Sequence, residues 1–332
     1  MSSEPILRVK DLTIDLLTAH TVVRPVDGVA YELSRRETLA IVGESGSGKT
    51  VTCFAPLGLM PVGVQADISG SILFDSRQLV GSDTETLRSL RGKSIGFIFQ
   101  DPMSALNPAR RVGRQIAEVA ELHLGMTARA AETRALELIK MVGMSDPEIR
   151  LKQYPHELSG GLRQRVMIAI AIAAEPTLLV ADEPTTALDV TVQAQILRLL
   201  KEIQSRMDMA MILITHDMGV VAGAADRVMV MYAGRHVETG PTERVLSQPQ
   251  HPYTMGLIDA IPRKQDAIGS RFRGLPGVPP ILGAPITGCA FMPRCGYAVD
   301  ACGERRPPFL PTAVPGVSAA CPVLNIRAKE CA

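Results

Sequence analysis

Short apolar runs alternate with amphipathic stretches along most of this 332-residue chain. Apolar residues at three- and four-residue spacing predict helices, and compact runs rich in Val, Ile and Leu predict buried strands. The predicted strands are several short ones within 6–42, then Ser71–Phe74, Ser94–Phe99, Leu178–Ala181 and Met211–Thr215. The predicted helices cover about 104–154, Gly161–Ala174 and Val190–Arg206, and Asp226–Glu238 predicts a hairpin that turns at Ala233-Gly234. Strands that alternate with helices favour an α/β fold with a parallel sheet.

Composition narrows the environment in which this fold is expected. Apolar residues make up 46% and charged residues 21%, which favours a folded core over disorder. The formal net charge of +1 gives no sign of a nucleic-acid partner. No apolar run reaches about 18 residues, and the N-terminal MSSEPILRVK lacks the apolar stretch of a signal peptide. We therefore expect a cytoplasmic protein that reaches a membrane only through a partner.

A glycine-rich loop follows the buried strand predicted at Thr38–Val42. The loop consists of Gly43, Glu44, Ser45, Gly46, Ser47, Gly48, Lys49 and Thr50, and it fits the pattern G-x-x-x-x-G-K-[ST]. Glycines let the backbone N–H groups of such a loop face phosphates, and the following helix points its positive end at the same place. We expect Lys49 to bridge the β- and γ-phosphates and Thr50 to ligate Mg²⁺. A glycine-rich turn with an incidental lysine would not explain the flanking strand and helix.

Two acids end a second apolar strand. The run Leu178-Leu-Val-Ala-Asp182-Glu183 buries its body and offers both carboxylates at the C-terminal edge of the sheet, where open α/β folds bind ligands. We expect Asp182 to hold Mg²⁺, directly or through water, and Glu183 to orient and polarise the attacking water. Alone, such a pair is more often a solvated loop or a helix cap. Phosphoryl transfer needs mainly positioning and charge neutralisation, so the phosphate loop favours the catalytic interpretation.

A third motif, Leu158-Ser159-Gly160-Gly161-Leu162-Arg-Gln164-Arg, resembles the LSGGQ signature of the ABC transporter ATPases. Leu162 stands where glutamine is usual, and members of the peptide-importer branch often carry a hydrophobic residue there. In this family the signature meets the γ-phosphate bound by the opposite subunit. The resemblance therefore implies nucleotide contacts from Ser159, Gly160, Gly161 and Gln164. An ordinary serine-capped helix is the alternative, but it leaves the spacing to the other motifs unexplained.

Three shorter motifs extend the resemblance. Gln100, in FIFQDP, resembles the family's glutamine that senses Mg²⁺ and faces the membrane subunits, so it is expected at both nucleotide and metal. Ala187-Leu188-Asp189 resembles the loop that couples two ATP sites. His216, in ITHD, resembles the switch histidine that contacts the γ-phosphate. The family's pattern thus implies that Glu183 and His216 are the catalytic residues.

The resemblance covers about residues 6–262. It implies the ABC ATPase fold, which has a RecA-like P-loop core, an antiparallel β subdomain and a helical signature subdomain, here at about 104–157. One departure concerns adenine, because residues 18–30 lack the aromatic side chain on which the family usually stacks the base. His20 or an aliphatic residue is expected to substitute for it.

The composition changes after about residue 262, since residues 274–322 are dense in Pro and Gly. We interpret 1–262 as the nucleotide-binding domain and 263–332 as a small cysteine-rich C-terminal module with little hydrophobic core. Several stretches resemble the C-terminal extension of the dipeptide and oligopeptide importer ATPases. They are His251-Pro-Tyr253-Thr, Ala260-Ile-Pro262, Gly274–Pro280, Cys289–Cys295 and Arg306–Pro308.

Four cysteines of this tail, Cys289, Cys295, Cys302 and Cys321, are spaced C-x5-C-x6-C-x18-C. Four thiolates suit tetrahedral zinc or a [4Fe–4S] cluster, and the lack of the close cysteine pairs typical of structural zinc favours the cluster. Similar family members hold an iron–sulfur cluster, so the resemblance implies one here, in a structural role. Zinc is the second choice and disulfides, in a reducing compartment, the third. Four unlinked thiols suit a module with few apolar residues poorly, and Cys53 and Cys331 are interpreted as ordinary thiols.

Together the motifs imply an ATP-hydrolysing subunit that powers import of dipeptides or oligopeptides. The implied partners are a second homologous ATPase subunit in a heterodimer, two membrane permease subunits, and an extracytoplasmic peptide-binding protein that acts through the permeases. The implied location is the cytoplasmic face of the cell membrane. Another cargo, such as nickel or antimicrobial peptides, stays open because the cargo never touches this chain.

Two other classes of ABC protein fit less well. A soluble ABC ATPase that acts on DNA or ribosomes usually carries two nucleotide modules or a long coiled-coil insertion, and neither is seen in the sequence. A non-catalytic regulatory subunit is disfavoured by the intact Lys49, Glu183 and His216.

Overall fold

A computed structural model describes residues 4–17, 21–61, 63–261, 274–280, 282 and 286–323. The chain forms two compact units. Among the described residues, unit one consists of residues 34–37 and 82–214, and unit two of residues 4–33, 38–81 and 215–323. No helix in the described ranges combines the length and the apolar character needed to cross a membrane.

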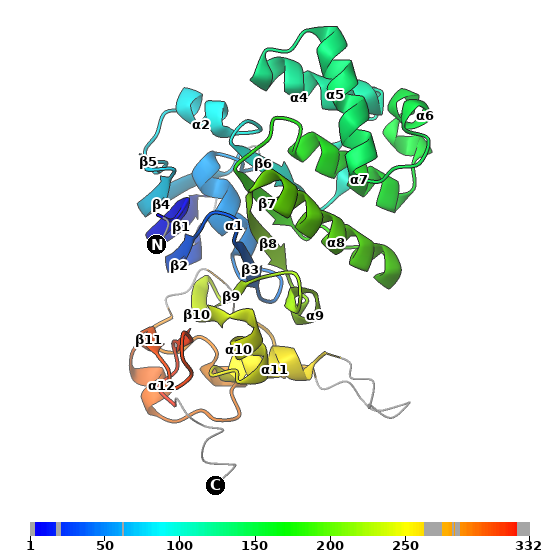
Figure 1. Ribbon diagram of the computed structural model, residues 1–332. Helices are drawn as coiled ribbons and strands as arrows, with labels where there is room; N and C mark the ends of the chain where they lie inside the picture. The colour runs from blue at the N-terminus through cyan, green and yellow to red at the C-terminus, as the bar shows by residue number, and fades with distance from the viewer. Residues whose placement is uncertain are drawn as a thin grey trace. The chain divides into compact units, whose positions relative to one another are not determined.

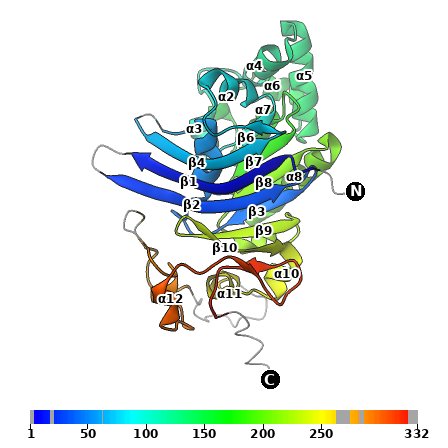
Figure 2. The ribbon, with the colours of Figure 1, turned by 90° about the vertical axis from the view of Figure 1, so that its left-hand side faces the viewer.

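Unit two contains an antiparallel sheet in the order β2-β1-β4-β5, whose long strands lie side by side in Figure 2. Its strands are β1 (Leu7–Leu17), β2 (Val22–Leu33), β4 (Gln65–Phe74) and β5 (Arg77–Gln78). The sequence predicted several short strands here, but β1 and β2 have 11 and 12 residues. The pairing of β1 with both neighbours shifts register near Asp11, whose φ is 49°. Such bulges interrupt the two-residue alternation of apolar positions, so one long strand looks like two short ones.

Unit two also contains a run of five strands in the order β11-β12-β10-β9-β3. These strands are β3 (Thr38–Val42), β9 (Arg227–Tyr232), β10 (Arg235–Pro241), β11 (Leu310–Pro311) and β12 (Ser318–Ala319). β3 and β9 are parallel, and the other pairs are antiparallel. The predicted hairpin is confirmed as β9–β10. Ala233 and Gly234 at its turn have φ values of 49° and 79°, the positive values that a tight hairpin turn requires.

The tail of the chain is built into the core of unit two, contrary to the expectation of a module with little hydrophobic core. Phe291, Val314 and Val317 are buried in one apolar cluster with Val42 of β3 and Tyr232 of β9. β12 adds main-chain hydrogen bonds to β10. Sequence reasoning missed this because the tail's apolar residues are few and widely spaced, so their burial depends on strands supplied from elsewhere in the chain.

The helices of unit two are short. They are α1 (Lys49–Phe54), η1 (Ala55–Leu57), α9 (Met218–Val221), α10 (Thr242–Ser247), α11 (Pro252–Asp259), η3 (Met292–Arg294) and α12 (Ala301–Glu304).

Unit one is an α/β arrangement in which β6 (Ile95–Ile98), β7 (Leu178–Asp182) and β8 (Ala210–Thr215) are parallel neighbours in that order. The residue after β8, His216, and Thr215 itself belong to unit two. The predicted parallel sheet is therefore confirmed for these strands. The longest described helix of unit one is α8 (Val190–Met207). The Asp189 side chain caps it by accepting from the Val192 N–H at 2.9 Å.

Helices fill most of the stretch of unit one that the apolar spacing predicted to be helical, and one helix that was not predicted, α2 (Thr84–Leu90), precedes it. The others are α3 (Pro102–Ala105), α4 (Val112–Leu124), α5 (Ala128–Met141), α6 (Pro147–Lys152), η2 (Pro155–Glu157) and α7 (Gly160–Ala171). α4, α5 and α6 pack on one another, and α4 and α5 also pack on α7 (Figure 1). The buried residues of α4 and α5 recur at three- and four-residue intervals, which explains why the sequence revealed them.

Candidate functional site

The predicted phosphate loop of unit two joins β3 to α1. All five residues of β3 are buried. A Cβ at Gly43 would lie 2.2 Å from the Met231 carbonyl oxygen, and one at Gly48 would lie 2.0 Å from the Pro25 carbonyl oxygen. Gly48 also has a φ of 95°, in the left-handed region that favours glycine. Gly43 and Gly48 are therefore required by the close packing of neighbouring backbone, and Gly48 also by its backbone conformation.

Polar groups gather along this loop. The Lys49 side chain is buried, and its Nζ donates to the carbonyl oxygens of Gly43 at 2.8 Å and of Glu44 at 3.0 Å. The Ser47 hydroxyl is buried without a hydrogen-bond partner among the described residues. Ser45, Gly46 and Thr50 are exposed. A buried ammonium and a buried hydroxyl at a glycine turn suit the oxygens of a phosphate chain.

The predicted carboxylates lie in unit one, at the end of β7. Asp182 is its last residue and is 5% exposed, and Glu183 follows with a φ of 45°. The Oε2 atom of Glu183 accepts hydrogen bonds from Gln100 Nε2 at 2.9 Å and from the Thr186 hydroxyl at 2.8 Å. The structure thus brings Gln100 and Glu183 together, although 83 residues separate them in sequence. This contact fixes the orientation of the Glu183 carboxylate.

The signature motif forms the start of α7 in unit one. Ser159 is the N-cap residue, but its side chain makes no capping hydrogen bond, and both Ser159 and Gly160 are exposed. The alternative of an ordinary serine-capped helix is therefore not what the structure contains. Gln164 is buried, and its Nε2 atom has no partner within the described part of the chain. The helix start thus presents a hydroxyl and backbone N–H groups at the surface.

His216 and the Ala187–Asp189 loop occupy turns after strands. His216 follows Thr215 directly and is exposed, and the next residue, Asp217, caps α9 by accepting from the Gly219 N–H at 2.7 Å. Ala187 has a φ of 62° and is exposed. His20, the proposed neighbour of adenine, lies outside the described residues.

Comparisons with known proteins agree with these motifs. The family model of the ABC transporter matches residues 26–186, and that of the oligopeptide/dipeptide transporter C-terminal region matches residues 237–302. The oligopeptide transport ATP-binding protein OppD of Bacillus subtilis is 50% identical over 304 residues, which cover 92% of this chain and 85% of OppD. The chain belongs to the oligopeptide and dipeptide branch of the ABC transporter ATP-binding proteins.

Other relatives of this ABC protein extend the match. The dipeptide transport ATP-binding protein DppD of Bacillus subtilis is 48% identical over 92% of this chain and 90% of DppD. Among solved structures, cbiO1 of Clostridium perfringens, part of an ABC transporter complex, is 29% identical with a TM-score of 0.63 over 74% of this chain and 92% of its own. An ATP-binding cassette dimer bound to ADP and Pi has the same TM-score at 26% identity, over 71% of this chain and 98% of its own. The predicted ABC ATPase fold is therefore confirmed.

The metal centre expected from the number and spacing of the tail cysteines is not supported by the described residues. Within the described ranges, no group of three or more His, Cys, Asp or Glu side chains is assembled so that it could hold a metal ion. Burial raises the pKa of the Cys289 and Cys295 thiols and raises that of Cys321 to about 11. Cys289 and Cys295 are packed against the apolar cluster of unit two, and the neighbouring tail cysteines contribute to the raised pKa values. The four-cysteine site is thus not supported by the structure, and Cys331 lies outside the described residues.

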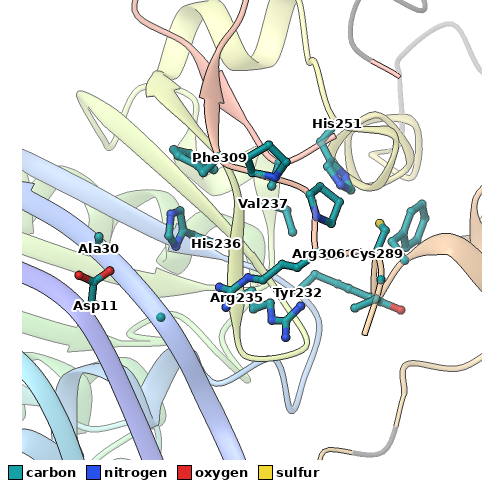
Figure 3. A pocket seen from close by; sticks show the side chains of 17 residues that line it. Asp11, Ala30, Tyr232, Arg235, His236, Val237, His251, Cys289, Arg306 and Phe309 are labelled. Atoms are coloured by element: carbon teal, nitrogen blue, oxygen red, sulfur yellow. The ribbon is translucent and has the colours of Figure 1, made fainter. Parts of the chain in front are cut away.

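A cavity of about 380 Å³ lies beside Cys289 in unit two (Figure 3). Arg235 and Arg306 line it, and both pair with Asp27, at 2.6 Å and 3.6 Å. The Asp11 side chain lines the same cavity. Two carboxylates therefore balance the two guanidinium groups, so the cavity has no surplus charge that would select an anion.

Proposed function

We propose that this chain binds and hydrolyses MgATP and thereby powers import of dipeptides or oligopeptides across a membrane. The observation that carries the proposal is the phosphate loop, in which Gly43 and Gly48 are required by packing and Lys49 is held on the loop. The names of OppD and DppD, which describe oligopeptide and dipeptide transport, support the choice of cargo.

ATP binding in this proposal exchanges the partners of Lys49. Its ammonium now donates to two neutral carbonyl oxygens, and charged phosphate oxygens form stronger hydrogen bonds with an ammonium than carbonyls do. The phosphate chain would therefore draw Lys49 away from Gly43 and Glu44. The Ser47 hydroxyl, together with N–H groups of the loop after Glu44, would donate to the remaining phosphate oxygens.

Three oxygen-bearing side chains are the proposed Mg²⁺ ligands. They are the Thr50 hydroxyl, the Gln100 amide and the Asp182 carboxylate, and hard oxygen donors of this kind are what Mg²⁺ prefers. The bound ion would neutralise charge on the phosphates. Gln100 Nε2 already donates to Glu183, so the amide oxygen is the atom proposed to turn toward the metal.

Glu183 is the proposed base that orients the attacking water. Gln100 and Thr186 fix its carboxylate by donating to one oxygen, and a fixed base lowers the entropic cost of reaching the reactive geometry. His216, exposed after β8, is the proposed contact to the γ-phosphate. Release of the phosphate would then break the contacts that hold the loop, the water and the histidine in one arrangement.

The signature helix requires a second ATPase subunit. Because the Ser159 side chain does not cap its own helix, its hydroxyl and the first N–H groups of α7 are suited to an anion brought by another chain. We propose that Ser159, Gly160, Gly161 and Gln164 approach the nucleotide of a homologous partner in a heterodimer. Two permease subunits and an extracytoplasmic peptide-binding protein would complete the transporter at the cytoplasmic face of the membrane.

Transport in membrane vesicles tests this function. The complete transporter with its native partner subunits should accumulate labelled dipeptides or oligopeptides when ATP is supplied, and Lys49→Ala in this chain should abolish uptake. The exposed Lys152→Ala is the matched control and should leave uptake unchanged. Uptake of nickel without peptide, or peptide uptake that persists in the Lys49→Ala transporter, would contradict the proposal.

The iron–sulfur cluster stays a separate proposal that rests on the number and spacing of the four tail cysteines. Protein purified without oxygen should contain about four irons and matching acid-labile sulfide per chain if the cluster forms. Colourless protein with stoichiometric zinc, or with no metal, would rule the cluster out. The division of the chain at residue 262, which lies outside the described residues, likewise stays a prediction.

A further inference from the structure

An arginine of the tail contacts the phosphate loop directly. Arg294 binds Glu44 of the loop in a bidentate ion pair, with NH1 to Oε2 at 2.6 Å and NH2 to Oε1 at 3.0 Å. The two residues lie 250 positions apart in sequence, within unit two. The side chain of Arg294 is 4% exposed and that of Glu44 is 27% exposed. A bidentate pair of this kind fixes orientation as well as distance, because the planar guanidinium matches both carboxylate oxygens.

Arg294 is itself held firmly. Its Nε donates to the Pro276 carbonyl oxygen at 2.6 Å, and NH1 also donates to the Tyr232 hydroxyl at 3.2 Å. The guanidinium carbon lies 5.8 Å from the ring centres of Tyr232 and Phe291, at the distance of a cation–π contact. The guanidinium is thus fixed by Pro276 and Phe291 of the tail and by Tyr232 of β9. Because the Arg294 side chain is held rigidly, the position of the tail determines the position of the Glu44 carboxylate.

Glu44 links this contact to the lysine of the site. Its backbone N–H donates to the Tyr253 hydroxyl at 2.8 Å, and its carbonyl oxygen accepts from Lys49 Nζ at 3.0 Å. The side chain, the amide and the carbonyl of this one residue are therefore held by Arg294, Tyr253 and Lys49. The backbone of the phosphate loop at Glu44 is fixed from outside the loop, by two residues of the C-terminal part of the chain.

We propose that Arg294 is a positioning residue for nucleotide binding, which holds Glu44 and thereby keeps the phosphate loop in the conformation that receives ATP. The proposal rests on the proposed function of that loop. Arg294 forms the end of η3 and stands beside Cys295, so the cysteine-bearing segment Cys289–Cys295 carries the group that orders the ATP site. The tail is accordingly a structural part of the nucleotide site.

Binding of MgATP to the purified full-length chain tests the proposal, with isothermal titration calorimetry as the measurement. Arg294→Ala should raise the Kd for MgATP about tenfold, within the range of coupling between linked sites. Arg294→Lys keeps the charge but loses the planar fork, so it should fold and recover only part of the affinity. Arg305→Ala removes an exposed arginine of the same tail and is the matched control.

A double variant separates positioning from a general structural role. If Arg294 acts through Glu44, the Glu44→Gln, Arg294→Ala double variant should bind MgATP within about twofold of Arg294→Ala alone. If the double variant instead lost affinity by the product of the two single-variant losses, the proposal would be overturned, because Arg294 would then act independently of Glu44. Binding by Arg294→Ala within about twofold of wild type would also overturn it, and so would a wild-type Kd in Arg294→Lys if the alanine variant does not fold.

The same titration distinguishes failure of the proposed ATP site from failure of the role proposed for Arg294. Wild-type protein that binds no MgATP, or Lys49→Ala protein that binds it as tightly as wild type, would refute the ATP site itself. Normal binding by wild type, with loss in Lys49→Ala and no loss in Arg294→Ala, would refute only the role of Arg294.

Discussion

The phosphate loop and the Glu183 turn are held by different kinds of interaction, although each follows a five-residue strand that is completely buried. The loop is confined by backbone packing at Gly43 and Gly48 and by buried partners such as Arg294. The Glu183 turn is oriented by hydrogen bonds from Gln100 and Thr186, two exposed side chains. The loop is therefore preorganised, and substitution of Gly43 or Gly48 is expected to disrupt it. The orientation of the Glu183 carboxylate therefore depends on two side-chain hydrogen bonds, whereas the loop is confined by its packed backbone.

The largest expected effect concerns chemistry at the acid turn. Glu183→Gln should lower ATP hydrolysis by the complete transporter about 10³-fold, the range for loss of a general base, while MgATP binding to this chain persists. An amide can still accept from Gln100 and Thr186, so the fold should be unchanged. Turnover assays and nucleotide titrations measure the two effects. Glu175→Gln, at an exposed acid of the same unit, is the control, and undiminished turnover in Glu183→Gln would refute the assignment of the base.

A pair of glycine substitutions tests the intolerance of the loop. Gly48→Ala would place Cβ 2.0 Å from the Pro25 carbonyl oxygen at a φ of 95°. The clash and the strained backbone should together cost roughly 3 kcal/mol or more of loop stability. Gly46→Ala is the matched variant, because its φ is 79° but nothing lies within 4 Å of the added Cβ. MgATP titration should show a much larger loss for Gly48→Ala. Equal losses would mean that backbone strain, and not packing, confines the loop.

A buried carboxylate of β10, Glu238, predicts a pH dependence of stability in unit two. Burial raises the pKa of Glu238 to about 7, although its carboxylate accepts from the backbone N–H groups of Gln250 and His251. The folded state therefore binds this proton more tightly than the unfolded state. The contribution of Glu238 to stability is full below its unfolded pKa of 4.5 and is lost as pH rises through about 7.

Comparison of wild type with Glu238→Gln isolates this group from the buried histidines, which titrate in both proteins. Denaturant unfolding should show that the variant gains about 3 kcal/mol relative to wild type between pH 4 and pH 8, since each pKa unit is worth about 1.4 kcal/mol. The exposed Glu243→Gln should show no such gain. A constant difference between Glu238→Gln and wild type across this range would contradict the raised pKa.

The smallest expected effect concerns the second anchor of Glu44. Tyr253→Phe removes the hydroxyl that accepts from the Glu44 N–H at 2.8 Å. Loss of this hydrogen bond should cost about 1–2 kcal/mol of unfolding free energy and weaken MgATP binding slightly. Thermal unfolding with and without MgATP measures both effects. Tyr297→Phe, at an exposed tyrosine of the tail, should change neither, and an unchanged Tyr253→Phe would mean that Arg294 alone suffices.

The sequence by itself determined the local pieces of this protein: the phosphate loop, the acid pair after its strand, the signature helix and the hairpin at Ala233-Gly234. These features depend on residues that are neighbours in the chain, so glycine conformation, strand burial and helical spacing were sufficient to predict them. The long β1 was not predicted, because its bulge breaks the alternation that sequence reasoning uses.

Only the tertiary structure decided how distant segments act together. No spacing rule links Arg294 to Glu44 or Gln100 to Glu183, because each pair depends on the path of the chain between its members. The structure of the C-terminal tail likewise could not be predicted from its own sequence. Its few apolar residues and thiols predicted a separate metal-bound module, whereas Phe291, Val314 and Val317 are buried with residues of β3 and β9. Burial is a property of the whole core, so a segment's own composition does not determine what stabilises it.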